Sequence, residues 1–160
     1  MRYNELTFQG RNAVLEAFRS GKTIDKLFIL DGCQDGPIKS IVREAKKTDA
    51  IINYVDKERL DRLAGTGHHQ GVVAIGAAYE YAEVEDILAA AKEKGEDPFI
   101  FILDEIEDPH NLGAIIRTAN LAGAHGVIIP KRRAVGLTAT VAKTSAGAIN
   151  YTPVAKVTNI

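Results

Sequence analysis

Apolar residues recur at helical spacing in three stretches of the first 76 residues, and short apolar runs separate these stretches. In the first stretch, Val14, Leu15 and Phe18 share one helical face, and Gly21 marks its end. The pattern predicts helices within 10–21, 37–47 and 56–65 and strands at 25–30, 50–55 and 71–77. Because helices and strands alternate, we expect a small, complete α/β unit with a parallel or mixed sheet between helices.

Residues 77–97 differ in composition, since the stretch 77–109 holds eleven carboxylates against two lysines. We expect an acidic linker at 77–97 that carries one short helix, over about 83–94, and ends near Gly95 and Pro98. The sequence therefore predicts one domain at 1–76 and another at 98–160.

The second domain begins with a continuous apolar run, 98–106, which predicts a strand buried under helices on both faces. The pattern then predicts a helix at 109–122, a strand at 125–129, a helix at 138–146 and a strand at about 151–157. Thr158 and Asn159 are good N-cap residues, yet no helix follows them. Because three strands leave too little structure to cover their apolar faces, we expect the chain to be a fragment of a longer protein.

The composition is that of an ordinary globular protein, with 46% hydrophobic and 26% charged residues. The sequence has neither an apolar run long enough to cross a bilayer nor the pattern of a secretory signal. The single cysteine, Cys33, cannot form an internal disulfide, which agrees with a reducing compartment. We therefore expect a cytoplasmic protein with no membrane partner.

The charges are distributed unevenly along the chain. Residues 110–160 contain six Lys or Arg and no Asp or Glu, whereas the first 109 residues contain fourteen basic and twenty-one acidic side chains. Such asymmetry is typical of a protein in which one half of the chain binds a polyanion. It is also typical of a basic surface that is merely exposed to solvent. The charges alone leave both interpretations open.

The stretch DPHNLGAIIRTANLAGAHGVIIP, at 108–130, combines a polar start with one arginine in an apolar helix. Asp108 is a natural N-cap and Pro109 fits the first helical position. Gly113 lies one turn from Arg117, so we expect the missing side chain to leave space beside the arginine stem. The spacing alone permits either a surface arginine or a functional one. The positions that we expect to face the core are Ile115, Ile116, Ala119 and Ala122.

Several common motifs are absent from the sequence. There is no G-x-G-x-x-G after a strand, no G-x-x-x-x-G-K-[ST], no H-E-x-x-H and no cysteine cluster. A dinucleotide fold, a P-loop and a zinc site therefore have no support, and we expect no bound metal.

A longer pattern runs from Asp108 to Ala148: D-P-x-N-x-G-x-x-x-R-x-A, then G-A-x-G-x-x-x-P and K-x-S-A-G-A. On these residues, 103–160 closely resembles the first half of the catalytic domain in the SpoU, or TrmH-like, branch of the SPOUT RNA methyltransferases. The segments GRNAVLEAF and HHQGVVA resemble the small RNA-binding domain of the 23S rRNA guanosine 2′-O-ribose methyltransferases. The resemblance implies a small α/β RNA-binding domain followed by the front half of an α/β-knot (SPOUT) methyltransferase domain.

The resemblance also implies a reaction, in which a ribose 2′-hydroxyl attacks the methyl group of S-adenosylmethionine. Asn111 and Arg117 stand at the asparagine and arginine of the family's first motif, which makes them the catalytic candidates. An arginine is a poor proton acceptor because its pKa exceeds about 12, so a more conservative role is to hold a phosphate and stabilise the developing alkoxide. Asn111 would orient Arg117 or the ribose.

The family's second and third motifs, which hold the cofactor, are missing after Ile160. No residue of this chain is therefore assigned to cofactor binding, and we expect this fragment to be inactive. The full-length protein would be the enzyme, and the resemblance implies that it forms a homodimer.

Two groups of residues are candidates for RNA contacts. In the second domain, the basic turn Lys131, Arg132 and Arg133 follows a strand and could neutralise phosphates, and Lys143 is a weaker candidate. The alternative is a solvated basic turn. The candidates of the first domain are Arg11 and Asn12 at a helix start and, within the loop GTGHHQG (65–71), His68, His69 and Gln70.

Other interpretations of these residues remain open. His68 and His69 could supply half of a metal site, but the sequence offers no partner ligands, so we expect exposed loop histidines. The tyrosines at 54, 79 and 81 could be core residues or platforms on which bases stack.

The function implied by the resemblance is 2′-O-ribose methylation of 23S rRNA, as naked RNA or in a large-subunit precursor. The alternatives are a noncatalytic RNA-binding or ribosome-assembly module, and a tRNA 2′-O-methyltransferase. The extra N-terminal domain argues mildly against the tRNA substrate.

Overall fold

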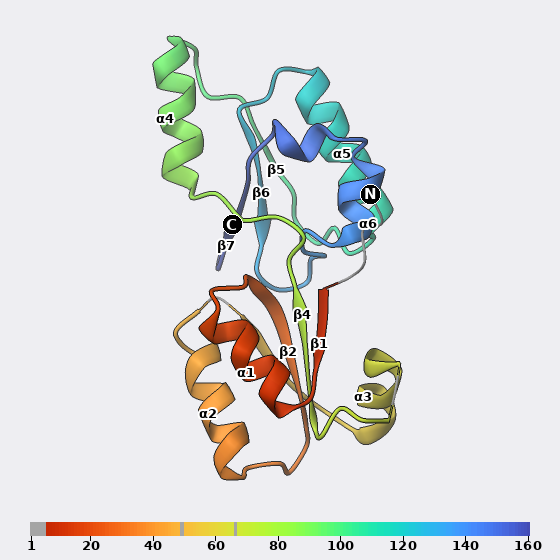
Figure 1. The fold of residues 1–160 in the computed structure, drawn as a ribbon. Coiled ribbons are helices and arrows are strands. Elements are labelled where there is room, and N and C mark those ends of the chain that lie inside the picture. Colours follow the sequence, from red (N-terminus) through yellow and green to blue (C-terminus); the bar gives the residue numbers. More distant parts are fainter. Residues whose placement is uncertain (1–5, 49, 66) are drawn as a thin grey trace. The chain divides into compact units, whose positions relative to one another are not determined.

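The computed structural model describes residues 6–48, 50–65 and 67–160, and the chain divides into two compact units (Figure 1). The N-terminal unit ends at Ala77, and the C-terminal unit comprises Ala78–Ile160. Both units combine helices with a sheet, so the α/β class expected from the sequence is confirmed. In the described residues, no helix has the length and apolar character needed to cross a membrane.

The N-terminal unit has a mixed four-stranded sheet in the order β1-β4-β2-β3. Strand β4 pairs antiparallel with both β1 and β2, and β2 pairs parallel with β3. The strands are β1 (Leu6–Gln9), β2 (Ile24–Leu30), β3 (Ile51–Val55) and β4 (Val72–Gly76). The pattern did not predict β1, because this short edge strand has no fully buried residue.

Helices cover both faces of this sheet, as the alternation of its side chains requires. Leu27 and Ile29 of β2 pack with α1 and α2, while Phe28, between them, packs on the opposite face with Leu60 of α3. The helices are α1 (Arg11–Arg19), α2 (Gly36–Ala45) and α3 (Lys57–Ala64).

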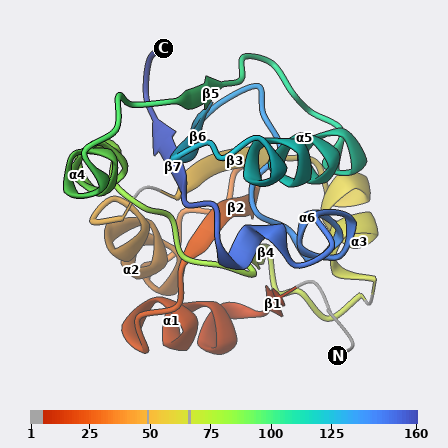
Figure 2. The ribbon, with the colours of Figure 1, turned by 90° about the horizontal axis from the view of Figure 1, so that it is seen from above.

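The C-terminal unit has a parallel three-stranded sheet in the order β5-β6-β7. Its strands are β5 (Ile100–Ile102), β6 (Gly126–Pro130) and β7 (Val154–Val157). Its helices are α4 (Val84–Lys94), α5 (Pro109–Leu121), α6 (Ala139–Thr144) and the 3₁₀ helix η1 (Ala148–Asn150). The views along and across the sheet show α5 and α6 on one face and α4 on the other (Figures 1 and 2).

The expectation that the run 98–106 is a strand buried on both faces is wrong. Strand β5 has only three residues, and Ile102 is 58% exposed. The physical reason is its place at the edge of the sheet, where it has a single neighbouring strand.

The stretch 77–97 differs from the linker that its composition suggests. Ile87 of α4 is fully buried against Ile128 and Ala155, and the close approach needs a glycine at 126, where a Cβ atom would come within 2.5 Å of Ile87 Cδ1. Helix α4 therefore covers one face of the second sheet and belongs to the C-terminal unit, despite its acidic surface.

Candidate functional site

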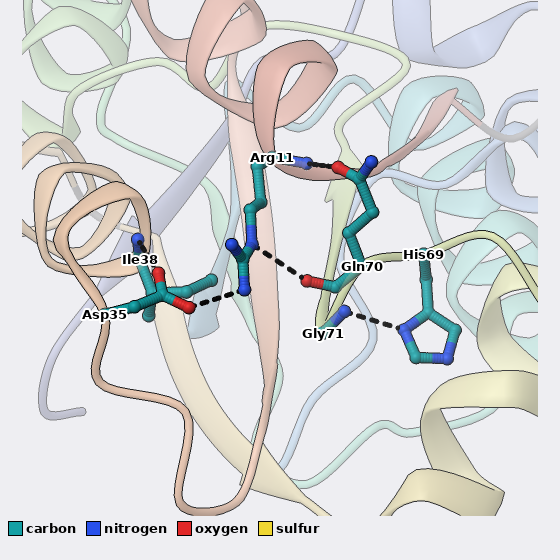
Figure 3. A network of polar contacts seen from close by, with 6 residues as sticks. All are labelled: Arg11, Asp35, Ile38, His69, Gln70 and Gly71. Carbon is teal, nitrogen blue, oxygen red and sulfur yellow. Dashed lines mark hydrogen bonds and ion pairs between the residues drawn. The ribbon is translucent and has the colours of Figure 1, made fainter.

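In the N-terminal unit, the first turn of α1 is held by the loop before β4 (Figure 3). Gly10 occupies the N-cap position with φ of +87° and supplies no capping side chain. Gln70 takes over that role, since its Oε1 accepts a hydrogen bond of 3.1 Å from the backbone N–H of Arg11. Gln70 itself has φ of +51°, a left-handed conformation that is uncommon without glycine.

The side chain of Arg11 joins three segments of the chain (Figure 3). Its Nε donates to the carbonyl oxygen of Gln70 at 3.2 Å, and its Nη2 donates to a carboxylate oxygen of Asp35. The other oxygen of Asp35 caps α2 by accepting from Ile38 N–H at 3.1 Å. The charge of Arg11 is thus partly neutralised before any ligand arrives, although the pair is half-exposed and an anion can compete for it.

Three of the predicted RNA-contact residues meet at one pocket. Arg11, Asn12 and Gln70 line a cavity of about 600 Å³ together with residues at and after the end of β2 and with Gly71. Residues almost 60 positions apart in the sequence are brought together because α1 starts beside the loop that precedes β4.

His69 lies inside the protein, so the expectation that both loop histidines are exposed is wrong for this residue. Its side chain is buried, Nδ1 accepts from the Gly71 N–H at 3.0 Å, and Nε2 lies 2.8 Å from Asp61 Oδ1. Since Nδ1 accepts, Nε2 carries a proton and donates to Asp61. His69 therefore fixes the backbone beside Gln70, while His68 is exposed as expected. Position 66 of the predicted loop lies outside the described residues.

In the C-terminal unit, α5 begins as predicted. Asp108 Oδ1 accepts from His110 N–H at 2.7 Å and from Asn111 N–H at 3.3 Å, and Pro109 is the first helical residue. Arg117 lies in the middle of α5 and is exposed, and within the described chain its side chain makes no hydrogen bond or ion pair. Its donors are therefore available to a ligand.

The role predicted for Gly113 is wrong. A Cβ atom there would lie 1.8 Å from Thr144 Oγ1 and 2.7 Å from Thr144 Cβ, so the missing side chain makes room for α6 and not for the stem of Arg117. The hydroxyl of Thr144 also donates to the carbonyl oxygen of Pro109 at 3.2 Å. The buried face of α5 consists of Leu112, Gly113, Ile116 and Ala119, whereas Ala122 is exposed and Ile115 only half-buried.

Asn111 and Arg117 lie on different flanks of α5. At 100° per residue they are separated by roughly 120° around the axis and about 9 Å along it. In the described residues no hydrogen bond joins their side chains. A direct orienting contact from Asn111 to Arg117 is therefore absent from this structure.

The predicted basic turn lies at the carboxyl end of β6, and its three cations differ. Arg133 forms an ion pair of 2.9 Å with Glu105, and both residues have left-handed backbones, with φ of +54° and +57°. Lys131 is half-buried, and its backbone N–H donates to the carbonyl oxygen of Val157 in β7 at 2.8 Å. Only Arg132 is exposed and without a hydrogen bond or ion pair among the residues described.

The surroundings of this turn are mixed in charge, because the segment between β5 and α5 is acidic. Its carboxylates are those of Asp104, Glu105, Glu107 and Asp108. Parallel strands end at one edge, so this segment and the basic turn share the carboxyl edge of the sheet. Lys143, on α6, is exposed. Across the described ranges, no group of three or more His, Cys, Asp or Glu could hold a metal ion.

Sequence reasoning missed Asp35 and Asp61, the partners of Arg11 and His69. An Asp directly before Gly-Pro at a helix start is a capping signal that could have identified Asp35. Sequence reasoning also missed the buried residue His125. Its Nδ1 accepts from Phe99 N–H at 3.0 Å, and its Nε2 lies 2.9 Å from Glu96 Oε2. No sequence signal connects residues so far apart.

Comparisons with known proteins give two family matches. The family described as RNA 2′-O ribose methyltransferase substrate binding matches residues 9–82, and the SpoU rRNA Methylase family matches residues 98–160.

Two curated relatives match most of the chain. A Bacillus subtilis protein named "Putative TrmH family tRNA/rRNA methyltransferase YacO" is 55% identical over 151 residues, which are 94% of this chain and 60% of that protein. A Staphylococcus haemolyticus protein named "Putative TrmH family tRNA/rRNA methyltransferase" is 48% identical over 156 residues, 98% of this chain and 62% of that protein. The chain thus spans about 60% of the length of these relatives.

Two solved structures are more distant. The SpoU methyltransferase AviRb from Streptomyces viridochromogenes, in complex with AdoMet, is 21% identical with a TM-score of 0.44, covering 99% of this chain and 56% of that one. An AdoMet-bound rRNA methyltransferase from Sinorhizobium meliloti is 24% identical with a TM-score of 0.42, covering 94% of this chain and 54% of that one.

Proposed function

Since the chain belongs to the SpoU/TrmH family of RNA methyltransferases, we propose that it provides the RNA-binding domain and the front of the catalytic domain of a 2′-O-ribose methyltransferase. The proposed substrate is 23S rRNA, free or in a large-subunit precursor, and the proposed methyl donor is S-adenosylmethionine. The observation that carries the proposal is Arg117, an exposed and unpaired guanidinium in the described part of the chain, at the position of the family's arginine.

We assign residues 1–76 to RNA binding and 98–160 to the start of the catalytic domain. Two observations support this division: the two family matches, at 9–82 and 98–160, and the pocket that collects Arg11, Asn12 and Gln70. Residues 77–97 would then connect the two functions, with α4 packed on the second sheet.

Arg117 would act through its charge. When the ribose 2′-oxygen loses its proton, negative charge develops on it, and a fixed cation nearby lowers the energy of that state. A guanidinium also offers paired N–H donors that suit a neighbouring phosphate. Asn111 would contact the ribose independently, because it lies on another flank of α5.

The residues at the carboxyl edge of the second sheet do not by themselves fit the adenosyl cofactor. A ligand of that kind needs a largely apolar slot with a few polar groups, whereas the loops here present the paired charges of Glu105 and Arg133. We assign no cofactor contact to this chain. Together with the 60% span of the relatives, this supports the inference that methyl transfer needs a longer protein.

The basic turn and Lys143 would contact phosphates in this function. Arg132 is the strongest of these candidates, since Arg133 is already paired with Glu105. In the N-terminal unit, His69 would act indirectly by fixing the loop, whereas Arg11, Asn12, His68 and Gln70 would touch RNA. We further propose that the whole protein is a cytoplasmic homodimer.

A tRNA substrate is the second candidate, because the relatives are named as tRNA/rRNA methyltransferases. The test is transfer of a labelled methyl group by the whole protein to purified 23S rRNA and, separately, to total tRNA. We expect ribose methylation of the 23S rRNA alone. Methylation of tRNA alone would reverse the substrate assignment, and binding without methylation of either RNA would favour a noncatalytic RNA-binding or ribosome-assembly module.

A further inference from the structure

The N-terminal unit has a second pocket, of about 430 Å³, that none of the proposed RNA contacts occupies. Its lining comes from α2, from the loop before α2 and from β3. Ile38 and Val42 supply apolar surface. The polar lining is dominated by three cations and one tyrosine: Lys39, Arg43, Lys46 and Tyr54.

The three cations form one stripe along α2. Lys39 and Arg43 of α2 and its C-cap residue Lys46 follow one another at spacings of four and three residues, so they lie within about 60° of the helix circumference. All three are exposed, and in the described residues none of their side chains takes part in a hydrogen bond or ion pair. The N–H donors of these three side chains are therefore available to a ligand.

The acidic neighbour on α2, Glu44, is held mainly by Lys47, and the charge of Arg43 contributes less to lowering its pKa. The carboxylate of Glu44 accepts hydrogen bonds of 2.9 and 3.0 Å from Lys47 Nζ, and this contact lowers the pKa of Glu44 below its ordinary value. Glu44 is thus already paired with a cation outside the pocket.

Tyr54 gives the pocket an aromatic wall. It lies near the end of the edge strand β3, and the residue is 56% exposed. Ile52, two residues earlier and therefore on the same face of the strand, packs against the core beneath α1 and α2. Within the described chain the hydroxyl of Tyr54 has no hydrogen bond, and the residue lines the pocket together with side chains of α2.

We propose that this pocket binds an unpaired nucleotide of the RNA, with its base stacked on Tyr54 and its flanking phosphates on Lys39, Arg43 and Lys46. An aromatic face beside a line of cations is the combination that holds single-stranded RNA, since any base can stack and every nucleotide carries a phosphate. A duplex cannot use the aromatic wall, because its bases are already stacked on one another. This inference rests on the proposed RNA-binding function and adds to it a separate subsite.

The test compares two fluorescein-labelled RNAs by anisotropy, a hairpin with a single-stranded loop and a blunt duplex of equal length. Tyr54→Ala should weaken hairpin binding by roughly 5- to 150-fold and leave duplex binding unchanged. Tyr54→Phe keeps the aromatic ring and should bind the hairpin like the unmodified chain. Replacing the three cations with Gln should lower the salt slope for the hairpin by about 2, at about 0.7 per phosphate.

Arg11→Ala is the reference variant, because Arg11 belongs to the other pocket. If Arg11→Ala weakens hairpin binding while Tyr54→Ala does not, the second subsite is disproved and the proposed RNA-binding function stands. Equal losses of hairpin and duplex binding in Tyr54→Ala would also disprove the second subsite, since stacking on an unpaired base would not be involved. If the unmodified chain binds neither RNA, both proposals for the N-terminal unit fail.

Discussion

At the scale of single residues, Gly113 and His69 have structural roles close in the sequence to residues that we propose to contact RNA. Gly113 lets α6 approach α5 one helical turn before Arg117, and His69 fixes the backbone next to Gln70. Both residues support neighbours that we propose to touch RNA, without touching it themselves.

Gly113→Ala should destabilise the C-terminal unit by about 1–3 kcal/mol, because the new methyl group would overlap Thr144 and force α5 and α6 apart. The measurement is urea unfolding followed by circular dichroism. Thr118→Ala, an exposed change on the same helix, is the control and should alter stability by less than about 0.5 kcal/mol. Equal stability of the two variants would show that the helices can separate without cost.

His69→Ala should lower the free energy of unfolding of the N-terminal unit by about 1–3 kcal/mol, since it leaves the Gly71 N–H without its acceptor. The neighbouring His68→Ala removes an exposed side chain and should change little. Chemical denaturation of both variants measures the difference. An effect of His68→Ala as large as that of His69→Ala would contradict the assignment of a structural role to His69 alone.

Capping residues could be predicted at this scale, whereas distant partners could not. Asp108 and Pro109 start α5 as the sequence indicates, because a cap acts within three residues of its own position. The partner of Gly113 is Thr144 and that of Arg11 is Gln70, and only the folded chain brings them together.

At the scale of elements, the helices were easier to predict than the strands. A helix buries its own periodic face, so α2 and α5 follow from the pattern of apolar residues. A strand depends on its neighbours: β1 is short and only partly buried, and the apolar run 98–106 yields a strand of three residues at a sheet edge.

The basic turn after β6 should bind RNA less strongly than its three cations suggest. Replacing Lys131, Arg132 and Arg133 with Ala should weaken RNA binding and reduce its salt slope by about 0.7–0.9 for each phosphate that the turn no longer neutralises. Because Arg133 is paired with Glu105, Glu105→Gln should free it and strengthen binding. Titrations at several salt concentrations measure both effects, and an unchanged slope in the triple variant would exclude phosphate binding by this turn.

At the scale of the whole molecule, the chain divides into two compact units, each combining helices with a sheet. Composition suggested an acidic linker at 77–97, but the buried face of α4 places most of that stretch in the C-terminal unit. A helix can carry charged residues on its exposed face and still bury its other face. The composition of a stretch indicates mainly the charge of the exposed face. The resemblance identified the family correctly because its motif extends over some forty residues.

The most direct test of the account is ribose methylation by the whole protein carrying Arg117→Ala. We predict a loss of about 100- to 1000-fold in the rate of methyl transfer to 23S rRNA, with the unfolding midpoint unchanged, because Arg117 is exposed and makes no hydrogen bond or ion pair in the described chain. Lys94→Ala, which removes an exposed cation from α4, should retain the full rate. A near-normal rate for Arg117→Ala would contradict the catalytic role proposed for this residue.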